Sequence, residues 1–196
     1  MTRLVLATRN EDKAAEFRAL LGDGVTEVLT MESFPALGEI DEDGTTLEEN
    51  ALKKARTVFK ATGLPSLADD SGLEVFYLNG APGVYSARFS GPGATYESNC
   101  RKLLELMRGV PPRRRSARFR CVLAIVTRES EEVVEGVCHG RITESRQGTS
   151  GFGYDPVFVP AGHNRAFAEM NPEEKNKISH RALALNRLRP LLTGHL

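Results

Sequence analysis

Residues 148–156 form a glycine-rich segment that can present an aromatic ring to a ligand. Phe152 lies between Gly151 and Gly153, and the exit from the turn is fixed by the next three residues, Tyr154, Asp155 and Pro156. Glycine permits bends and close approaches that a side chain would prevent. A ring presented in this way offers a flat face for a purine. Taken alone, the segment also suits an ordinary connection between strands, with Phe152 in the core.

A second polar segment lies where a short apolar stretch passes into a helical pattern. It comprises six consecutive residues, Thr8, Arg9, Asn10, Glu11, Asp12 and Lys13. Backbone N–H groups at a helix start point outward, and the helix dipole favours an anion. Lys13, in the first turn, can add a point charge to a phosphate. The alternative is a capped helix with Lys13 in solvent, and the sequence contains no Gly-x-x-x-x-Gly-Lys loop.

Two adjacent aspartates, Asp69 and Asp70, follow the apolar pair Leu67 and Ala68 and precede Ser71. If this stretch is a strand, the two carboxylates point to opposite sides, so one of them faces a given ligand. A carboxylate at a strand end can hold Mg²⁺, which prefers oxygen ligands and substrate phosphates. A turn in which an aspartate caps the backbone is an equally good interpretation of these residues.

Acidic residues also gather at 41–43, where Asp41 and Glu42 lie in a loop-like stretch. A solvated loop is expected there, although it can supply the second carboxylate of a metal site. Lys54 falls on the apolar side of a helical pattern with Leu47 and Ala51. Its ammonium either snorkels to solvent or points at a bound phosphate or carboxylate.

The C-terminal part carries three further polar candidates, Lys175, His180 and Arg181. The donors of an arginine fork can bind the carbonyl edge of a base, although such residues usually form a solvated face. The single basic cluster consists of Arg113, Arg114, Arg115, Arg118 and Arg120. Nucleic-acid binding is one interpretation of this cluster, and a solvated loop beside the sheet is favoured over it.

The spacing of apolar residues predicts the elements that position these side chains. Strands are expected near 4–7, 25–30, 73–78, 119–126 and 132–139, and helices near 11–21, 45–63, 94–108 and after Asn171. The last helical stretch either continues past Ser179 or starts afresh there. Strand–helix units together with neighbouring strands predict an α/β fold with a mixed sheet.

Composition narrows the function classes. The 196 residues suit a single domain, 1–196. Lys+Arg and Asp+Glu balance at 26 each, which argues against nucleic acid or an anionic membrane as a partner. No apolar run approaches the ~18 residues of a membrane span. The three cysteines have no CxxC spacing, so we expect no disulfide framework or zinc site and a cytoplasmic location.

Taken together, these segments resemble the inosine triphosphate pyrophosphatase family, which removes non-canonical purine nucleoside triphosphates such as ITP, dITP and XTP. The resemblance runs from Leu4 to Arg181 in the same order. Its motifs are Gly44-Thr-Thr-Leu-Glu-Glu-Asn-Ala, Leu67-Ala-Asp-Asp-Ser-Gly-Leu, Gly80-Ala-Pro-Gly-Val-Tyr-Ser-Ala-Arg, Gly151-Phe-Gly-Tyr-Asp-Pro and Ser179-His-Arg.

The resemblance implies a two-lobed α/β fold with a long mixed sheet flanked by helices, a homodimer, and Mg²⁺-dependent cleavage to the nucleoside monophosphate and pyrophosphate. It implies phosphate binding by residues 8–13, Lys54 and Ser71. Asp70 would bind the metal and act as the base, and Asp41 or Glu42 would supply the other carboxylate. The base and sugar would be held by Phe152, Gly153, Tyr154, Asp155, Lys175, His180 and Arg181.

One position departs from the family, which usually has Thr-Gly-Asn where this chain has Thr8, Arg9 and Asn10. Arg9 is strained if the position needs a positive φ, and otherwise can add a phosphate contact. Two other functions remain as alternatives. One is a Maf-like pyrophosphatase of other modified nucleotides, against which the Phe152 and His180 motifs argue. The other is an RNA-binding module, which the neutral charge and 7% aromatic content disfavour.

Overall fold

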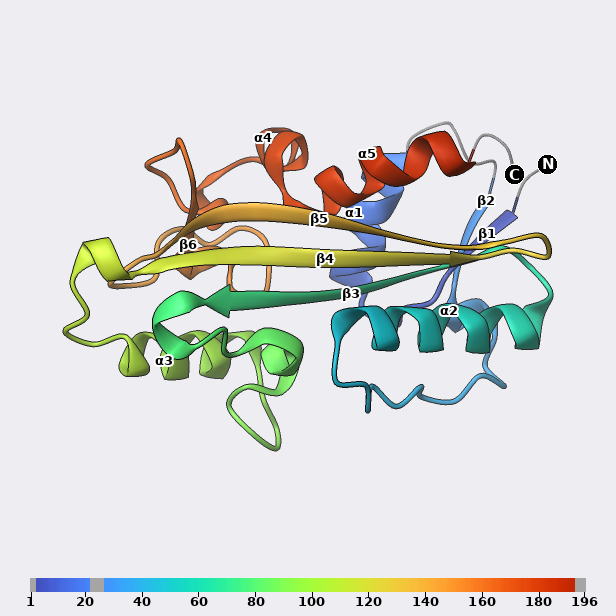
Figure 1. The fold of residues 1–196 in the computed structure, drawn as a ribbon, viewed down its shortest axis with the longest axis horizontal. Coiled ribbons are helices and arrows are strands. Elements are labelled where there is room, and N and C mark those ends of the chain that lie inside the picture. The colour runs from blue at the N-terminus through green and yellow to red at the C-terminus, as the bar shows by residue number, and fades with distance from the viewer. Residues whose placement is uncertain (1–2, 22–26, 193–196) are drawn as a thin grey trace. The chain divides into compact units, whose positions relative to one another are not determined.

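The structure is a computed structural model that describes residues 3–21 and 27–192 (Figure 1). The chain forms two compact units. The first unit comprises Met1–Asp70, Cys121–Gly136 and Arg181–Leu196, and the second comprises Ser71–Arg120 and Val137–His180. This division agrees with the two lobes that the family resemblance implies.

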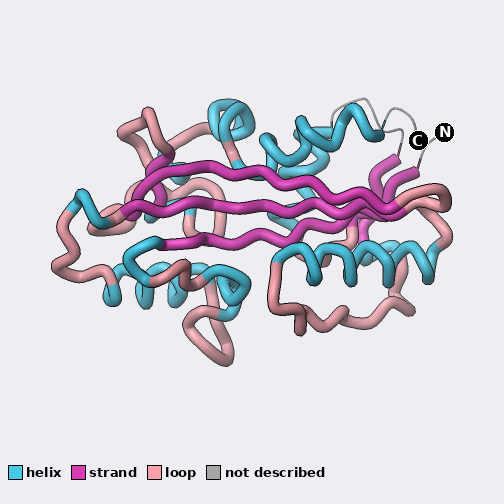
Figure 2. The backbone as a smooth tube through the Cα atoms, in the orientation of Figure 1, coloured by secondary structure: helices cyan, strands magenta, loops and turns pink. Residues whose placement is uncertain are grey.

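Figure 2 shows the strands of one mixed sheet in magenta. The strands are β1 (Arg3–Leu6), β2 (Glu27–Thr30), β3 (Ser66–Val75), β4 (Ser116–Val126), β5 (Glu131–Ile142) and β6 (Phe158–Pro160). Their order is β2-β1-β3-β4-β5-β6. Strand β1 pairs in parallel with β2 and β3, whereas β6 runs antiparallel to β5. The predicted α/β class with a mixed sheet is therefore confirmed.

The helices are α1 (Glu11–Leu21), α2 (Leu47–Thr62), α3 (Tyr96–Leu106), α4 (Pro172–Ile178) and α5 (His180–Leu192). Helix α2 begins with a capping box in which Thr46 and Glu49 satisfy each other's backbone N–H groups. It ends at Gly63, whose φ of 67° is the left-handed conformation that glycine adopts without a steric penalty. The C-terminal stretch is two helices rather than one, and the chain breaks at Ser179.

The core of the first unit lies where α1 and α5 pack on the sheet. Phe17 of α1 and Leu185 of α5 belong to one buried cluster with Leu67 of β3 and Leu123 of β4. Successive side chains of a strand point to opposite faces, so Asp69 shares the face of Leu67. Asp70 shares the other face, which α2 covers with its buried stripe of Leu47, Asn50, Ala51, Lys54, Ala55 and Val58.

The second unit has its own core. Leu103 of α3 belongs to a buried cluster with the aromatic residues Phe119, Phe158 and Phe167. Phe119 and Phe158 meet edge to face, with ring centroids 4.6 Å apart, a favoured aromatic geometry. In the described part of the chain, no helix is long and apolar enough to cross a bilayer.

Three expectations differ from the structure. The strand expected at 73–78 is only the end of β3, which stops at Val75, and Phe76–Leu78 form a short 3-10 helix. Strand β3 starts at Ser66 and runs through Asp69 and Asp70, so the turn interpretation of that motif is wrong. The motif resembled a turn because polar residues rarely occupy the middle of a buried strand, where they require ionic partners from elsewhere. The strand expected at 25–30 is described from Glu27, and residues 25 and 26 lie outside the described residues.

Candidate active site

The segment after β1 caps α1 and leads into its first turn. The Asn10 side-chain oxygen accepts a hydrogen bond from the Lys13 backbone N–H at 3.0 Å, and the Thr8 hydroxyl accepts one from the Asn10 N–H at 3.1 Å. The predicted N-cap at Asn10 is therefore confirmed. Glu11 and Asp12 are exposed in the same turn.

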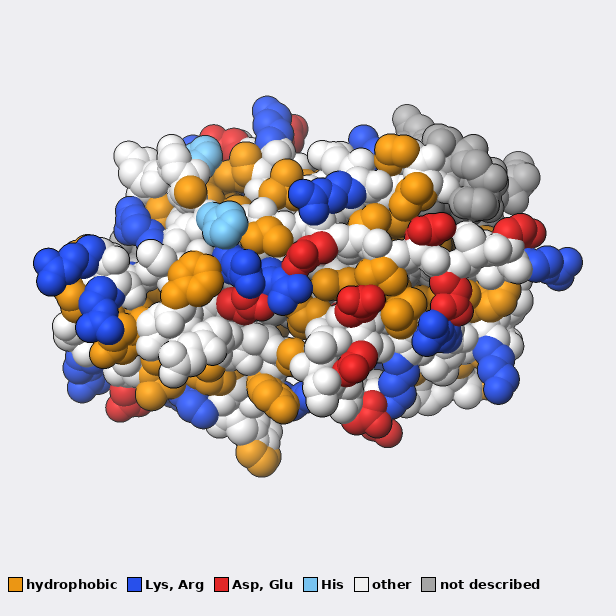
Figure 3. All heavy atoms as spheres, in the orientation of Figure 1, with side chains coloured by type: hydrophobic (Ala, Val, Ile, Leu, Met, Phe, Trp, Pro, Cys, Tyr) orange, Lys and Arg blue, Asp and Glu red, His pale blue; other side chains and the backbone are white. Residues whose placement is uncertain are grey.

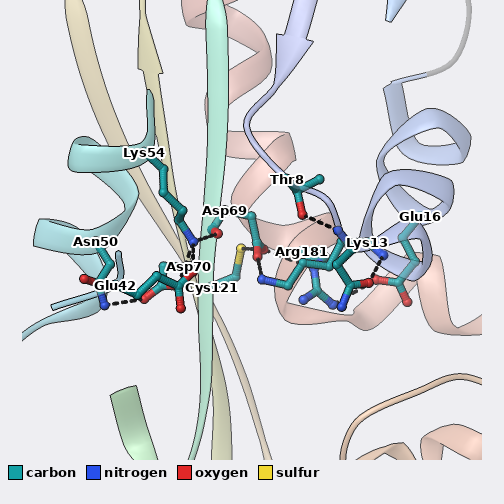
Figure 4. A network of polar contacts seen from close by, with 11 residues as sticks. Thr8, Lys13, Glu16, Glu42, Asn50, Lys54, Asp69, Asp70, Cys121 and Arg181 are labelled. Carbon is teal, nitrogen blue, oxygen red and sulfur yellow. Dashed lines mark hydrogen bonds and ion pairs between the residues drawn. The ribbon is translucent and has the colours of Figure 1, made fainter. Parts of the chain in front are cut away.

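Asp69 lies at the centre of a buried ionic cluster on the face covered by α1 and α5 (Figure 4). Its carboxylate pairs with the Lys13 ammonium and, at 3.1 Å, with Nε of Arg181. Cys121 Sγ lies 3.2 Å away, and Arg181 also pairs with Glu16 at 2.9 Å. Burial alone would raise the pKa of Asp69, but Arg181 and Lys13 outweigh it and hold that pKa well below its usual value. Asp69 is therefore ionised throughout the physiological range.

Asp70 belongs to a second ionic cluster, on the α2 side of β3. Its carboxylate accepts hydrogen bonds from Lys54 Nζ at 2.9 Å and from the Asn50 amide at 3.2 Å. The same ammonium donates to Glu42 at 2.7 Å and to the Asp69 carbonyl at 2.6 Å. Only 6% of Lys54 is exposed, so its side chain does not snorkel to solvent.

The electrostatics of this second cluster favour a further cation. Burial raises the pKa of Asp70, and the charge of Glu42 raises it further, although Lys54 opposes both. Burial also acts to lower the pKa of Lys54, but Asp70 and Glu42 more than compensate, so that pKa lies above its usual value. Two carboxylates thus share one ammonium. Asp41 is exposed and next to Glu42 in the chain.

Figure 4 shows Asp69 and Asp70 on opposite sides of β3, as strand alternation predicts. Each aspartate meets a different lysine, Lys13 or Lys54. The first unit therefore brings together the polar segment 8–13, the two aspartates, Lys54 and Glu42. Arg181 joins this group through Asp69.

Arg9 has a partner of its own. Among the described non-glycine residues only Asn79 has a positive φ, so the strained alternative for Arg9 is wrong. The exposed guanidinium donates a hydrogen bond to the backbone carbonyl of Leu37, which lies in the loop that carries Glu42.

In the second unit, the glycine-rich segment is held by one buried carboxylate. Asp155 Oδ2 accepts hydrogen bonds from the Phe152 backbone N–H at 3.0 Å and from Lys175 Nζ at 2.6 Å. Gly151 has φ +71°, and a Cβ there would lie 2.1 Å from the same oxygen. Gly153 has φ +61° and open space around its Cα. The backbone bend at these glycines therefore requires the absence of side chains.

The Phe152 ring is half-buried and lies among polar and aromatic neighbours instead of in the core. Lys175 Nζ is 5.0 Å from its ring centroid, and the Tyr96 ring lies 5.8 Å away. Tyr154 is buried, and its hydroxyl donates to the Ser86 carbonyl at 2.9 Å. Burial raises the pKa of Tyr154, so this phenol stays protonated.

The structure gives His180 and Arg181 different surroundings. His180 is buried in the second unit, where its ring stacks on Phe119 with centroids 4.6 Å apart. Arg181 belongs to the first unit and pairs with Asp69 and Glu16. Ser71, the first residue of the second unit, is half-buried.

The basic cluster is largely engaged within the protein. Arg118 and Arg120 both pair with Glu74, at 2.7 and 2.8 Å. Arg115 is buried and donates only to backbone carbonyls, those of Met107, Val110, Ile142 and Thr143. Acidic and basic side chains also intermingle over much of the face drawn in Figure 3. These contacts disfavour the RNA-binding alternative, because a nucleic-acid surface needs basic groups that reach phosphates.

Three residues that contact the candidate site residues were not predicted from the sequence. Asn50 contacts Asp70, Glu16 pairs with Arg181, and Tyr96 lies beside Phe152. An amide on the buried stripe of α2, four residues before Lys54, was a signal for Asn50. The other two have exposed or half-exposed positions with no local signal.

Comparison with known proteins identifies the family. The sequence model of the Ham1 family matches residues 4–191. The chain belongs to the Ham1 family. This match confirms the family resemblance predicted from the motifs and decides against the Maf-like alternative.

Individual relatives match over most or all of their length. A curated protein of Desulfotalea psychrophila named dITP/XTP pyrophosphatase is 50% identical over 183 residues, which are 93% of this chain and 81% of the relative. One of the same name from Bacillus licheniformis is 48% identical over 98% of both chains. The solved structure of a HAM1 protein from Coxiella burnetii aligns with a TM-score of 0.88 and 42% identity, covering 99% of this chain and 100% of that one.

Proposed function

We propose that this chain hydrolyses non-canonical purine nucleoside triphosphates, such as ITP, dITP and XTP, to the nucleoside monophosphate and pyrophosphate. The observation that carries the proposal is the first unit's cluster of Asp70, Lys54 and Glu42, which shares β3 with the Lys13 contact of Asp69. Ammonium groups and carboxylates in this arrangement suit the binding of a triphosphate with its metal ion. The names of the Ham1 relatives support the same substrate class.

The same cluster fits a divalent metal, which we take to be Mg²⁺. Asp70 and Glu42 share the single charge of Lys54, and burial keeps the pKa of Asp70 raised, so an added cation is favourable there. Within the described chain, no three acidic, histidine or cysteine residues form a metal-binding group. Mg²⁺ suits such a site because it commonly takes one or two carboxylates and completes its shell with water and substrate phosphates. When bound, it would neutralise part of the triphosphate charge.

Proton transfer and phosphate binding would fall to the chain's own residues. We propose that Asp70 accepts a proton from the attacking water, a role that its raised pKa supports because a carboxylate with a raised pKa is a stronger base than an ordinary one. Lys54 would hold the phosphates, together with Ser71 and residues 8–13. Asp69 orients Lys13 and need not touch substrate. Asp41 remains the alternative to Glu42 as the second carboxylate.

For base recognition we propose the glycine-rich segment together with Lys175, His180 and Arg181. We propose that Phe152 stacks on the purine, while Gly153, Tyr154 and the Asp155–Lys175 pair shape the segment that presents it. His180 and Arg181 are proposed to favour the 6-keto group. Adenine presents an amino donor at that position, so two donors would face each other, a mismatch of about 1–3 kcal/mol per unpaired group.

We also propose that residues 1–196 act as one domain with this single activity, as a cytoplasmic homodimer that uses neither nucleic acid nor membrane as a partner. The three free cysteines, all buried, agree with a reducing compartment.

A nucleotide panel tests the proposed specificity. With Mg²⁺ present, kcat/KM for ITP and XTP should exceed that for ATP by at least about tenfold, the value expected for one mismatched donor pair. Equal kcat/KM for ATP and ITP would refute the assigned base recognition.

A further inference from the structure

The loop between β2 and α2 carries Glu42 and makes few hydrogen bonds or ion pairs with the rest of the described first unit. At its C-terminal end, Glu42 pairs with Lys54, Asp43 pairs with Lys53, and the Gly44 N–H donates to the Asn50 side chain. These contacts begin only at residue 42. The preceding residues, 35–41, form no helix or strand and are mostly exposed.

One side chain holds the exposed part of this loop. Leu37 donates its own N–H to the Phe34 carbonyl, which is a local turn. Among the described residues, the bond from Arg9 to the Leu37 carbonyl is the only hydrogen bond that ties 35–41 to a distant part of the chain. The two residues are 28 positions apart in sequence. No other hydrogen bond between described residues therefore replaces the one from Arg9 in joining residues 35–41 to the start of α1.

Arg9 lies within the segment that caps α1, next to the Thr8 and Asn10 contacts of that cap. The loop it holds leads within five residues to Glu42, and Glu42 meets Asp70 through their shared ammonium on Lys54. The phosphate segment and the acidic loop are thus joined at two places, directly by Arg9 and indirectly through Lys54 and β3.

We propose that Arg9 is a positioning residue that latches the 35–43 loop and thereby sets the distance of Glu42 from Asp70. The inference deepens the proposed function, on which its metal and phosphate roles rest. It makes phosphate binding and metal binding interdependent, because Arg9, a member of the 8–13 segment, also restrains the loop that carries Glu42. A guanidinium has five N–H donors, so one bond to Leu37 leaves others for a phosphate.

The test compares Arg9→Gly and Arg9→Lys with Arg18→Ala. Arg18 is a matched control because it is a half-exposed arginine of α1 whose ion-pair partner is Glu11 of the same helix. Amide hydrogen exchange in the metal-free protein is the decisive readout, since it does not depend on turnover. The Mg²⁺ concentration that gives half-maximal ITP hydrolysis is the second.

In Arg9→Gly, exchange of the two hydrogen-bonded amides that flank the loop, Leu37 and Gly44, should accelerate by about two- to tenfold, the range for loss of one hydrogen bond. Exchange in α2 and β3 should stay unchanged. The Mg²⁺ requirement should rise severalfold. Arg9→Lys should lie between the wild type and Arg9→Gly, because an ammonium can donate one bond to Leu37, and Arg18→Ala should match the wild type in both readouts.

Unchanged exchange at both Leu37 and Gly44 in Arg9→Gly would overturn the latch, as would faster exchange spread evenly over the first unit. A rise in KM for ITP with normal loop exchange would make Arg9 a phosphate ligand only. If the loop loosens but the protein fails to release pyrophosphate from ITP, the latch stands and the proposed function falls.

Discussion

At the scale of single residues, the division of labour between Asp69 and Asp70 follows from strand register. The two side chains point to opposite faces of β3, and each face supplies different partners. Asp69 meets two buried cations and is locked in its ionised form, whereas Asp70 is held by one cation that it shares with Glu42. Only Asp70 combines a raised pKa with a position beside a second carboxylate.

Neutralising each aspartate should therefore give opposite phenotypes. Asp70→Asn should lower kcat by at least about 10²–10⁴, the usual contribution of a general base, and leave the melting temperature close to normal. Asp69→Asn should retain more activity but destabilise the fold by about 3–5 kcal/mol, because it leaves buried cations without their partner. Steady-state kinetics and denaturant unfolding on both variants make the comparison. The reverse assignment would be required if Asp69→Asn were stable but inactive.

The titration of Asp70 should set the acidic side of the activity profile. As pH falls through its raised pKa, the carboxylate gains a proton and loses its capacity as a base, so kcat/KM should decline at a pH above the ordinary aspartate value. Glu42→Gln removes a negative charge that raises this pKa. The acidic limb of the Glu42→Gln profile should therefore move to lower pH, even though the variant is slower. A limb that stays in place or moves upward would show that another group controls it.

At the scale of elements, contacts between residues close in sequence are largely predictable, whereas contacts between distant residues are not. The caps of α1 and α2 involve residues three positions apart, so Asn10 and the Thr45–Thr46 start were visible in the sequence. The Lys54 contacts with Glu42 and Asp70 span 12 and 16 positions, so periodicity placed Lys54 on α2 but left its partners open. Strand β6 has three residues, too few to show an alternating pattern.

The glycine-rich segment offers a matched pair of substitutions within one element. Gly151→Ala places a methyl group 2.1 Å from Asp155 Oδ2, and should displace that carboxylate from Phe152 and Lys175. Gly153→Ala shares a positive φ but meets nothing within 4 Å. Both should lose about 1–2 kcal/mol of stability from the backbone conformation. Gly151→Ala should also lower kcat/KM for ITP about tenfold more than Gly153→Ala does, because only Gly151→Ala displaces Asp155.

Melting curves and ITP kinetics on the two alanine variants provide the measurement. An equal loss of kcat/KM in both would show that the bend itself matters and that the Asp155 contact does not. Retained activity in Gly151→Ala would remove Asp155 from the account of base recognition.

At the scale of the whole molecule, the succession of expected strands and helices predicts the α/β class and the order of the motifs predicts the family, and both are confirmed. The arrangement of charges was less predictable, because equal totals of acidic and basic residues conceal where each group lies. Buried pairs such as Lys175–Asp155 and Arg181–Asp69 join residues 20 and 112 positions apart, so no local pattern encodes them. Such pairs hold the site residues in place before any ligand binds.

The most direct test of the central claim is the identity of the products formed from ITP with Mg²⁺. Phosphorus NMR of the reaction mixture distinguishes the two possible cuts. We predict IMP and pyrophosphate in equal amounts from the wild type and almost no product from Asp70→Asn. Release of orthophosphate with accumulation of IDP would contradict the assigned cleavage between the α- and β-phosphates.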